Sequence, residues 1–476
     1  MAADLPSTLA LNAWTGHKDG ITGHVGVVSA PGDLLRLALD GPLPAIERIL
    51  FAAEPPDPLN WQDPRVGWGL ILPDNDALSH ADRARAVDAP GPIRELLADR
   101  ADAPVFRYRP GSRYRWTMLW RYFADSAPLA PAITSSGFGV GPDQIPYYLL
   151  ICATPAEVPW EFQYLLNSRF AVGRLDLDAD GLANYVRALR ADWSEASADP
   201  FATVVWATDH GKADMSHVMR QYVAAPVFQA LQGDPSLSER SVLLDSAHGG
   251  ATSVALAGAL RGTPGLIVTV SHGVTCPLDD PAALAASLGL PVGEDLRSPL
   301  PADLLARWQP DGAIWYAHAC CSAGASGESI YAGISGLGSQ ITDVLSAVAE
   351  AGPIVAPLPR ALLGAKHPAR AFIGHVEPTF DYTIRQPETA QALTAGLVHA
   401  LHDGLYREHH PGRVGHAFRP YFEPIATAAS QQITLRRDYD VGWPVERQLI
   451  TAYLTARDRM STVILGDPTA QFRWQR

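Results

Sequence analysis

The chain has 476 residues, 47% of them hydrophobic and 18% charged, which indicates a folded globular protein with two or three domains at roughly 100 to 200 residues each. Its formal net charge is -13 and it has no long Lys/Arg cluster, so we expect no nucleic-acid partner. It shows no secretion signal, no run of about 18 uncharged apolar residues and only 4 cysteines, so we expect a cytoplasmic protein without a membrane span or a disulfide scaffold.

The first part of the chain shows weak periodicity. Residues 1–135 are rich in Pro, Trp and Arg and are predicted to form an irregular N-terminal module, closed by a Gly-rich loop at 135–144. From residue 145 the pattern changes to a strand at 147–153, a helix that follows it, and a second strand and helix. We therefore expect a small α/β subdomain at 145–195.

The remainder, residues 200–476, alternates short apolar runs with amphipathic stretches. The runs are FATVVWA, SVLLDSA, GLIVTVSH, GAIWYAHA, GPIVAPL and ARAFIGHV, and helical stretches are expected near 214–232, 251–261, 338–351 and 389–404. The fold class is therefore α/β, with a doubly wound, mainly parallel sheet of about six strands. The long connection at 274–310 is expected to shape or cover a binding cleft.

Reactive side chains follow two of these runs directly. GLIVTV is followed by Ser-His272-Gly273, and GAIWYA is followed by His318-Ala-Cys320-Cys321. Ligands of an open parallel sheet bind beyond the carboxyl ends of the strands, so we expect an imidazole and a thiol at one edge if these strands are neighbours. A nearby imidazole favours the nucleophilic thiolate, and the small residues that follow expose backbone N–H groups for a developing oxyanion. This predicts nucleophilic thiol catalysis.

The segments VTVSHG and WYAHACCSAG resemble the His-Gly and Ala-Cys motifs of the caspase-like cysteine peptidases. The pattern is most similar to the gingipain-type and related bacterial members. The segments YYLLICATPAEVPWEFQY and AVGRLDL resemble the smaller subdomain that precedes the catalytic domain in gingipain-type enzymes, and VILGDPTAQFR resembles their closing segment. The resemblance covers about residues 145–470 and implies a caspase-like fold. It also implies His272 as the base, a cysteine of the 320–321 pair as the nucleophile, and an oxyanion hole from the amides of Gly273 and that cysteine.

The sequence leaves the nucleophile open. An Ala-Cys dipeptide selects Cys320, which we favour, whereas a Cys-x-x-Gly interpretation selects Cys321. Successive residues leaving a strand point in opposite directions, so only one of the two thiols is expected to face His272. Asp209, His248 and His318 are predicted to contribute to substrate binding, although no acidic residue stands just before the cysteines to select a basic substrate.

Other interpretations of these residues remain. His248 also follows an apolar run and precedes Gly, so it competes for the base role, although it lies 72 positions from Cys320. The His and Cys side chains near the two motifs suit zinc chemically, but adjacent cysteines fit one tetrahedral ion badly, and we expect no metal and no cofactor.

The leading prediction is a cysteine endopeptidase acting on protein or peptide substrates, with regulatory self-cleavage within 274–310 and a regulatory protein partner. The alternative is a catalytically silent caspase-like scaffold that binds proteins through its N-terminal module.

Overall fold

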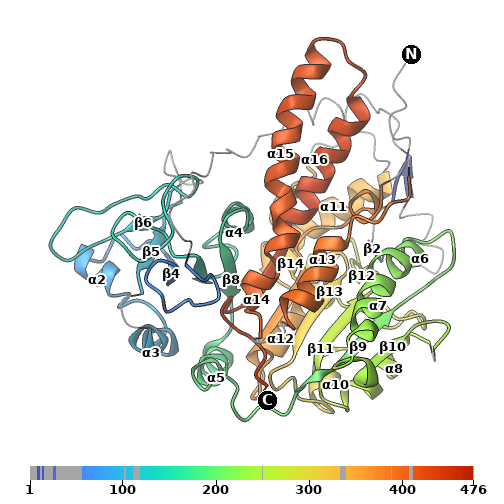
Figure 1. Cartoon of the computed structure of the whole chain (residues 1–476), viewed down its shortest axis with the longest axis horizontal. Helices are drawn as coiled ribbons and strands as arrows, with labels where there is room; N and C mark the ends of the chain where they lie inside the picture. The colour runs from blue at the N-terminus through green and yellow to red at the C-terminus, as the bar shows by residue number, and fades with distance from the viewer. Residues whose placement is uncertain are drawn as a thin grey trace.

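The computed structural model describes residues 8–10, 13–14, 25–27, 56–100, 103–110, 118–248, 250–332, 339–386, 389–406 and 411–474. Across these residues the protein is a mixed α/β structure built on one large sheet with helices on both faces (Figure 1). No helix within these ranges is long and apolar enough to cross a membrane.

The central sheet has eleven strands. In spatial order they are β10 (Ser241–Leu244), β9 (Asp199–Ala207), β11 (Pro264–Val270), β13 (Ile314–His318), β16 (Ala371–His375), β17 (Thr462–Gly466), β8 (Ala171–Leu175), β7 (Tyr148–Cys152), β4 (Trp68–Pro73), β5 (Val105–Tyr108) and β6 (Trp120–Arg121). Neighbouring strands are parallel except at β16–β17 and β5–β6. The antiparallel pairing of β16 with β17 divides the sheet into two halves whose strands, apart from the short edge strand β6, run in opposite directions.

The prediction of about six strands is therefore wrong. Five of the six runs form β9, β10, β11, β13 and β16, but the sixth contributes only β15 (Ile354–Val355), which pairs with β14 (Gly324–Ala325) outside the main sheet. The other six strands belong to the second half, where β17, β8 and β7 continue the same sheet. Strands β4, β5 and β6 lie within the range for which the sequence indicated an irregular module. The proposed domain boundaries stay a prediction.

Helices pack on both faces of the sheet because its strands are apolar on both sides. One face is covered by α3 (Gly91–Asp99), α5 (Ala179–Arg190), α8 (Ser253–Leu260), α10 (Pro301–Leu305) and α12 (Pro357–Gly364), whose apolar residues join one core that spans both halves. The other face of the first half is covered by α6 (Met215–Met219), α7 (Ala225–Gly233), α13 (Ala395–His399), α14 (Val414–Ala417) and α15 (Arg419–Asp440). On the second half this face packs against α4 (Trp160–Asn167).

Four further helices complete the described α-helices. They are α2 (His80–Ala84), α9 (Pro281–Ser287), α11 (Ser339–Ala351) and α16 (Glu446–Met460). Helices α15 and α16 form a long antiparallel hairpin that projects from the body of the molecule (Figure 1). Helices α9, α11 and α16 share a small apolar cluster with the cysteine pair, so the thiols lie against a helical layer.

The central strand β11 illustrates the packing logic. All seven of its residues are buried, and they alternate between the two apolar cores: Ile267 faces one, while Val268 and Val270 face the other. Alternation of this kind fixes the register, because a slip by one residue would exchange the two faces. The register in turn fixes which residues emerge together at the carboxyl end of the sheet.

Candidate functional site

The two predicted motifs emerge side by side at the carboxyl end of the first half of the sheet. Strands β11 and β13 are parallel neighbours in which Val270 pairs with His318, and the Ser271 N–H donates to the His318 carbonyl oxygen at 3.2 Å. A topological switch point lies between β9 and β11. The chain passes from β9 to its neighbour β10 on one side, and from β11 to its neighbour β13 on the opposite side. Open α/β sheets bind their ligands in such a crevice.

Gly273 packs directly on the backbone of Cys320. A Cβ atom added at Gly273 would lie 2.0 Å from the carbonyl oxygen of Cys320 and 3.1 Å from its nitrogen. Only glycine permits this approach. The backbones of the two predicted motifs are therefore in contact.

His272 is held by a carboxylate that the sequence did not single out. Its Nε2 lies 2.8 Å from Oδ1 of Asp214, and both side chains are buried, at 0% and 2% exposure. Asp214 caps the first turn of α6, where its carboxylate also accepts the Ser216 N–H at 2.6 Å. Burial disfavours the carboxylate, but the hydrogen bond and charge of His272 and the bonds from Ser216 outweigh it and lower the pKa of Asp214 below its ordinary value.

Two aromatic rings extend this pair. His210 stacks on His272 with ring centroids 5.8 Å apart, and Trp14 stacks on His210 at 6.4 Å. Trp14 belongs to β2 (Ala13–Trp14), which pairs in parallel with β12 (Gly273–Val274), the strand that follows His272. Burial, and then the proximity of His272, lower the pKa of His210, so this ring stays neutral near pH 7.

Both predicted nucleophiles are buried in the apolar cluster beneath α9, α11 and α16. Cys320 and Cys321 are each 0% exposed, and the Cys320 Sγ accepts the Thr379 N–H at 3.2 Å. Burial raises the pKa of both thiols, so each is protonated near neutral pH. Neither thiol forms a hydrogen bond with His272 in this structure. Cys321 has φ +56, which interrupts the strand alternation, and both cysteines belong to the same apolar cluster. The expectation that only one thiol faces His272 stays a prediction.

Glu377 ties the cysteine segment to the end of β16. Its main-chain oxygen accepts the Cys321 N–H at 3.3 Å, and its carboxylate accepts the Ser329 hydroxyl at 2.8 Å and the Ile330 N–H at 3.2 Å. The side chain is 1% exposed, and burial raises its pKa to about 7 despite these bonds. The loop that follows the cysteines is therefore held by a carboxyl group that titrates near neutral pH.

The predicted substrate-binding residues lie at different depths. Asp209 lies beside His210 and accepts from His217 and Arg220, each at 2.9 Å. His248 has a side chain 62% exposed and bonds to Asp245 at 2.7 Å, so it belongs to a separate pair from the one that holds His272.

His318, by contrast, offers no surface to a substrate here. It is 3% exposed, its Nδ1 lies 2.9 Å from the Tyr316 hydroxyl, and its ring packs against His375. Burial lowers the pKa of His318 to about 4, so it is a neutral core histidine. Its role in substrate binding stays a prediction that this position does not support.

The connection at 274–310 is folded rather than open. It contains β12, α9 and α10, and Val274 pairs with β2 beside the His210 stack. Its apolar side chains Leu284, Leu288 and Leu304 are buried. Among the described residues, no three His, Cys, Asp or Glu side chains converge on a point that could hold a metal ion.

Sequence reasoning missed Asp214 and Glu377. Asp214 begins a helix in the pattern Asp-Met-Ser, which is a recognisable N-cap signal, but nothing in its spacing connects it with a histidine 58 positions later. Glu377 stands two residues beyond the strand that ends at His375. The rule that singled out His272, namely that ligands bind beyond the carboxyl ends of parallel strands, therefore also applied to Glu377.

No protein-family model matches the chain, and no curated protein matches it either. Among solved structures, the crystal structure of the Arg-specific cysteine proteinase gingipain R aligns with a TM-score of 0.40 and 12% identity, over 70% of this chain and 65% of that one. A complex of the pro- and mature domains of RgpB from Porphyromonas gingivalis aligns with a TM-score of 0.36 and 11% identity, over 68% and 65%. The chain thus spans just under two thirds of each of these proteins. TM-scores below 0.5 do not establish a shared fold.

Proposed function

We propose that this chain is a caspase-like cysteine peptidase in which His272 is the general base and Cys320 the nucleophile, with Cys321 as the alternative nucleophile. The observation that carries the proposal is the buried Asp214–His272 pair at the β9–β11 switch point, next to a strand that delivers the cysteines. A histidine oriented by a carboxylate beside a nucleophile is the arrangement that activates weak nucleophiles. The resemblance of VTVSHG and WYAHACCSAG to caspase-like motifs points the same way.

The reaction follows from these roles. The Cys320 thiol gives its proton to His272, and its sulfur attacks the carbonyl carbon of a peptide bond. The amides of Gly273 and Cys320 stabilise the oxyanion, and the imidazolium returns the proton to the leaving amine. Water then adds to the thioester, releasing the acid and restoring the thiol. Asp214 holds the imidazole in one orientation and stabilises its charged form.

In the conformation seen here the enzyme is at rest. The Cys320 sulfur is buried and bonded to the Thr379 N–H, and its raised pKa keeps it protonated. Catalysis requires the segment that carries the cysteines to turn toward His272, and Glu377 holds the loop that follows this segment. Substrate binding, a protein partner or cleavage within 274–310 are the events that we propose to drive this change.

The buried thiols favour a second function, that of a catalytically silent scaffold that binds protein partners. Such a scaffold keeps the sheet and the buried histidine, and its cysteines serve only as core residues. The two functions differ in one measurable property, which is whether a thiol can react with a substrate-like electrophile.

The test is labelling with a library of acyloxymethyl ketone peptides, followed by mass spectrometry of the modified residue. The peptidase should be labelled at Cys320, with the label lost in Cys320→Ala and His272→Ala and strongly reduced in Asp214→Asn. Cys152→Ala is the matched control, because Cys152 is a half-buried cysteine in the other half of the sheet and its loss should leave labelling unchanged. Loss of label in Cys321→Ala alone would move the nucleophile to Cys321. No label in the wild-type chain, with or without limited proteolysis at 274–310, would favour the scaffold.

A further inference from the structure

The second half of the sheet has a carboxyl edge of its own. Because β16 and β17 are antiparallel, the parallel strands β17, β8, β7, β4 and β5 end at the edge opposite to the one that bears His272. Strand β4 leads through α2 and α3 to β5 on one side, whereas β7 leads through α4 to β8 on the other. The crevice between β4 and β7 is therefore a second topological switch point, and the rule that places ligands at such crevices applies to it independently of the first site.

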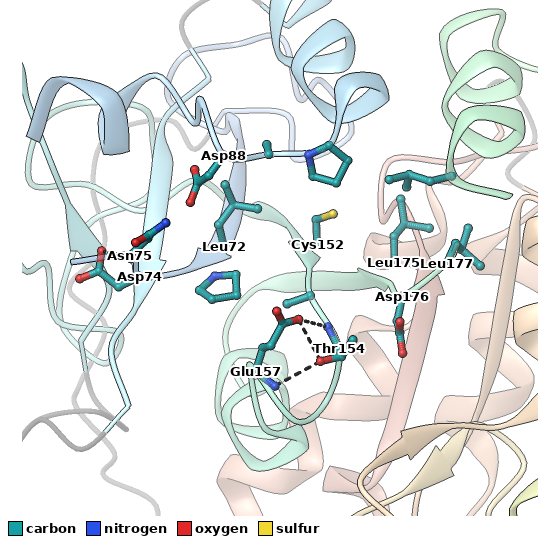
Figure 2. Close-up of a pocket in the computed structure, with 15 residues that line it drawn as sticks. Leu72, Asp74, Asn75, Asp88, Cys152, Thr154, Glu157, Leu175, Asp176 and Leu177 are labelled. Carbon is teal, nitrogen blue, oxygen red and sulfur yellow. Dashed lines mark hydrogen bonds between the residues drawn. The ribbon is translucent and has the colours of Figure 1, made fainter. Parts of the chain in front are cut away.

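A cavity of about 500 Å³ lies at this crevice, within the usual size of small-molecule sites. Its lining comes from the ends of β4, β7 and β8 and from the segments that follow them. Figure 2 shows the thiol of Cys152 and the apolar side chains of Leu72, Leu175 and Leu177 surrounded by polar groups. A ligand that fills the cavity must therefore have an apolar body.

The charged side chains of the lining are all of one sign. Four carboxylates line the cavity, those of Asp74, Asp88, Glu157 and Asp176, and no lysine or arginine does. The guanidinium groups that neutralise three of them, such as Arg107 on Asp88 at 2.7 Å and Arg360 on Asp176 at 3.0 Å, belong to residues outside the lining. Asn75 and Thr154 add neutral polar side chains, but an anionic ligand would meet no positively charged side chain among the described lining residues. The lining therefore favours a cation over a phosphate or a carboxylic acid.

Two of these carboxylates keep acceptor capacity for a ligand. Glu157 uses Oε2 for the Thr154 N–H and hydroxyl, both at 2.9 Å, and Asp176 uses Oδ1 for Arg360. Among the described residues, the other oxygen of each carboxylate forms no hydrogen bond. Glu157 has no ion-pair partner among the described residues, so the negative charge of its carboxylate is not compensated.

We propose that this cavity binds a small organic cation, namely an ammonium, amidinium or guanidinium group attached to an apolar body. The apolar part packs on Leu72, Leu175 and Leu177, and the cationic group donates to Glu157 and Asp176. The site lies on the opposite edge of the sheet from His272 and does not depend on the peptidase function.

The test uses three probes of similar shape: phenethylamine, 2-phenylethanol and phenylacetate. Saturation-transfer NMR on the full chain should show binding in the order amine, alcohol, acid, with the acid not bound. The double variant Glu157→Gln/Asp176→Asn should bind the amine about fivefold or more weakly, as expected for the loss of partly exposed ion contacts. Asp343→Asn/Glu350→Gln, which removes two exposed acids from α11, is the matched control and should bind as the wild type does. Equal binding of the acid and the amine, or an unchanged affinity in the lining variant, would overturn the proposal.

Cys152 gives a second measurement that needs no substitution. Phenethylamine should slow alkylation of Cys152 by iodoacetamide, because the ligand covers the thiol, and should leave alkylation of Cys276 unchanged. Cys276 is the matched control, since it is half-buried as well, lies in the connection after β12 and is not part of the lining of this cavity. Equal protection of both cysteines, or protection of neither, would contradict binding in this cavity.

Discussion

Replacement of Glu377 by glutamine should change how the stability of the protein depends on pH. The buried carboxyl has a pKa of about 7, against an ordinary value of 4.5, so the folded chain holds this proton more tightly than the unfolded chain does. Between these two values the unfolded chain releases the proton first, and the free energy of unfolding falls as the pH rises. A shift of this size corresponds to on the order of 2 to 3 kcal/mol between pH 5 and pH 8. Glutamine keeps the size and an acceptor for the Ile330 N–H but does not ionise.

The assay is urea unfolding of wild type and Glu377→Gln at pH 5 and at pH 8, followed by tryptophan fluorescence. The variant should lose less stability than the wild type on going to pH 8. Asp458→Asn should behave in the same way, because Asp458 is 2% exposed and burial raises its pKa to about 7 as well. Glu350→Gln, on the exposed face of α11, should not alter the pH dependence. Identical pH dependence in wild type and Glu377→Gln would refute the reasoning.

Three further substitutions test the packing of the site. Asp214→Ala leaves His272 buried without its carboxylate and should cost about 3 to 5 kcal/mol of unfolding free energy, measured by the same urea titration. Gly273→Ala places a Cβ 2.0 Å from the Cys320 carbonyl oxygen, so the melting temperature should fall by several degrees in a thermal scan. Gly258→Ala, within α8 and with nothing within 4 Å of the new Cβ, should leave the melting temperature unchanged or raise it.

The first half of the sheet was predictable because its strands follow the pattern of buried parallel strands. Each is a short apolar run between Gly, Pro or Asp, and five of the six runs form strands of the sheet. The run GPIVAPL carries the same pattern, but its chain forms only a two-residue strand at Ile354–Val355, and Pro357 then begins α12. Local composition therefore identified the apolar runs but not which of them join the central sheet.

In the second half, β7 and β8 were expected from the sequence, but β4, β5 and β6 were missed for a different reason. β4 has the sequence WGLILP, which satisfies the same rule, but it lies in a region dominated by Pro, Trp and Arg. β5 contains Arg107, which is 0% exposed and bonds to Asp88 and to two backbone carbonyl groups. A charged residue in a strand of four masks its apolar character, since buried charge is unexpected unless its partners are known.

The position of His272 at the end of β11 follows from sequence, whereas the orientation of the thiols does not. Strand alternation applies only while the backbone stays extended, and Cys321 leaves it with φ +56. Its amide then bonds to the carbonyl of Glu377, and both thiols face the cluster beneath α11. A left-handed residue three positions after a strand is selected by such tertiary contacts, and so the packing of the two cysteines could only be found from the structure.

One antiparallel pairing explains why the molecule has two separate edges on which ligands can bind. If β17 ran parallel to β16, the carboxyl ends of the strands at both switch points would lie on one edge of the sheet. The acidic cavity would then lie on the same edge as His272. The reversal instead directs the β9–β11 crevice, with its Asp214–His272 pair, to one edge and the β4–β7 crevice, with its four carboxylates, to the other. Gly173 allows β8 to pack closely on β17 next to this junction, since a Cβ there would lie 2.0 Å from the Gly466 carbonyl oxygen on β17. The two sites share a single continuous core, so a ligand in the second could alter the first only through that core, and not by direct contact.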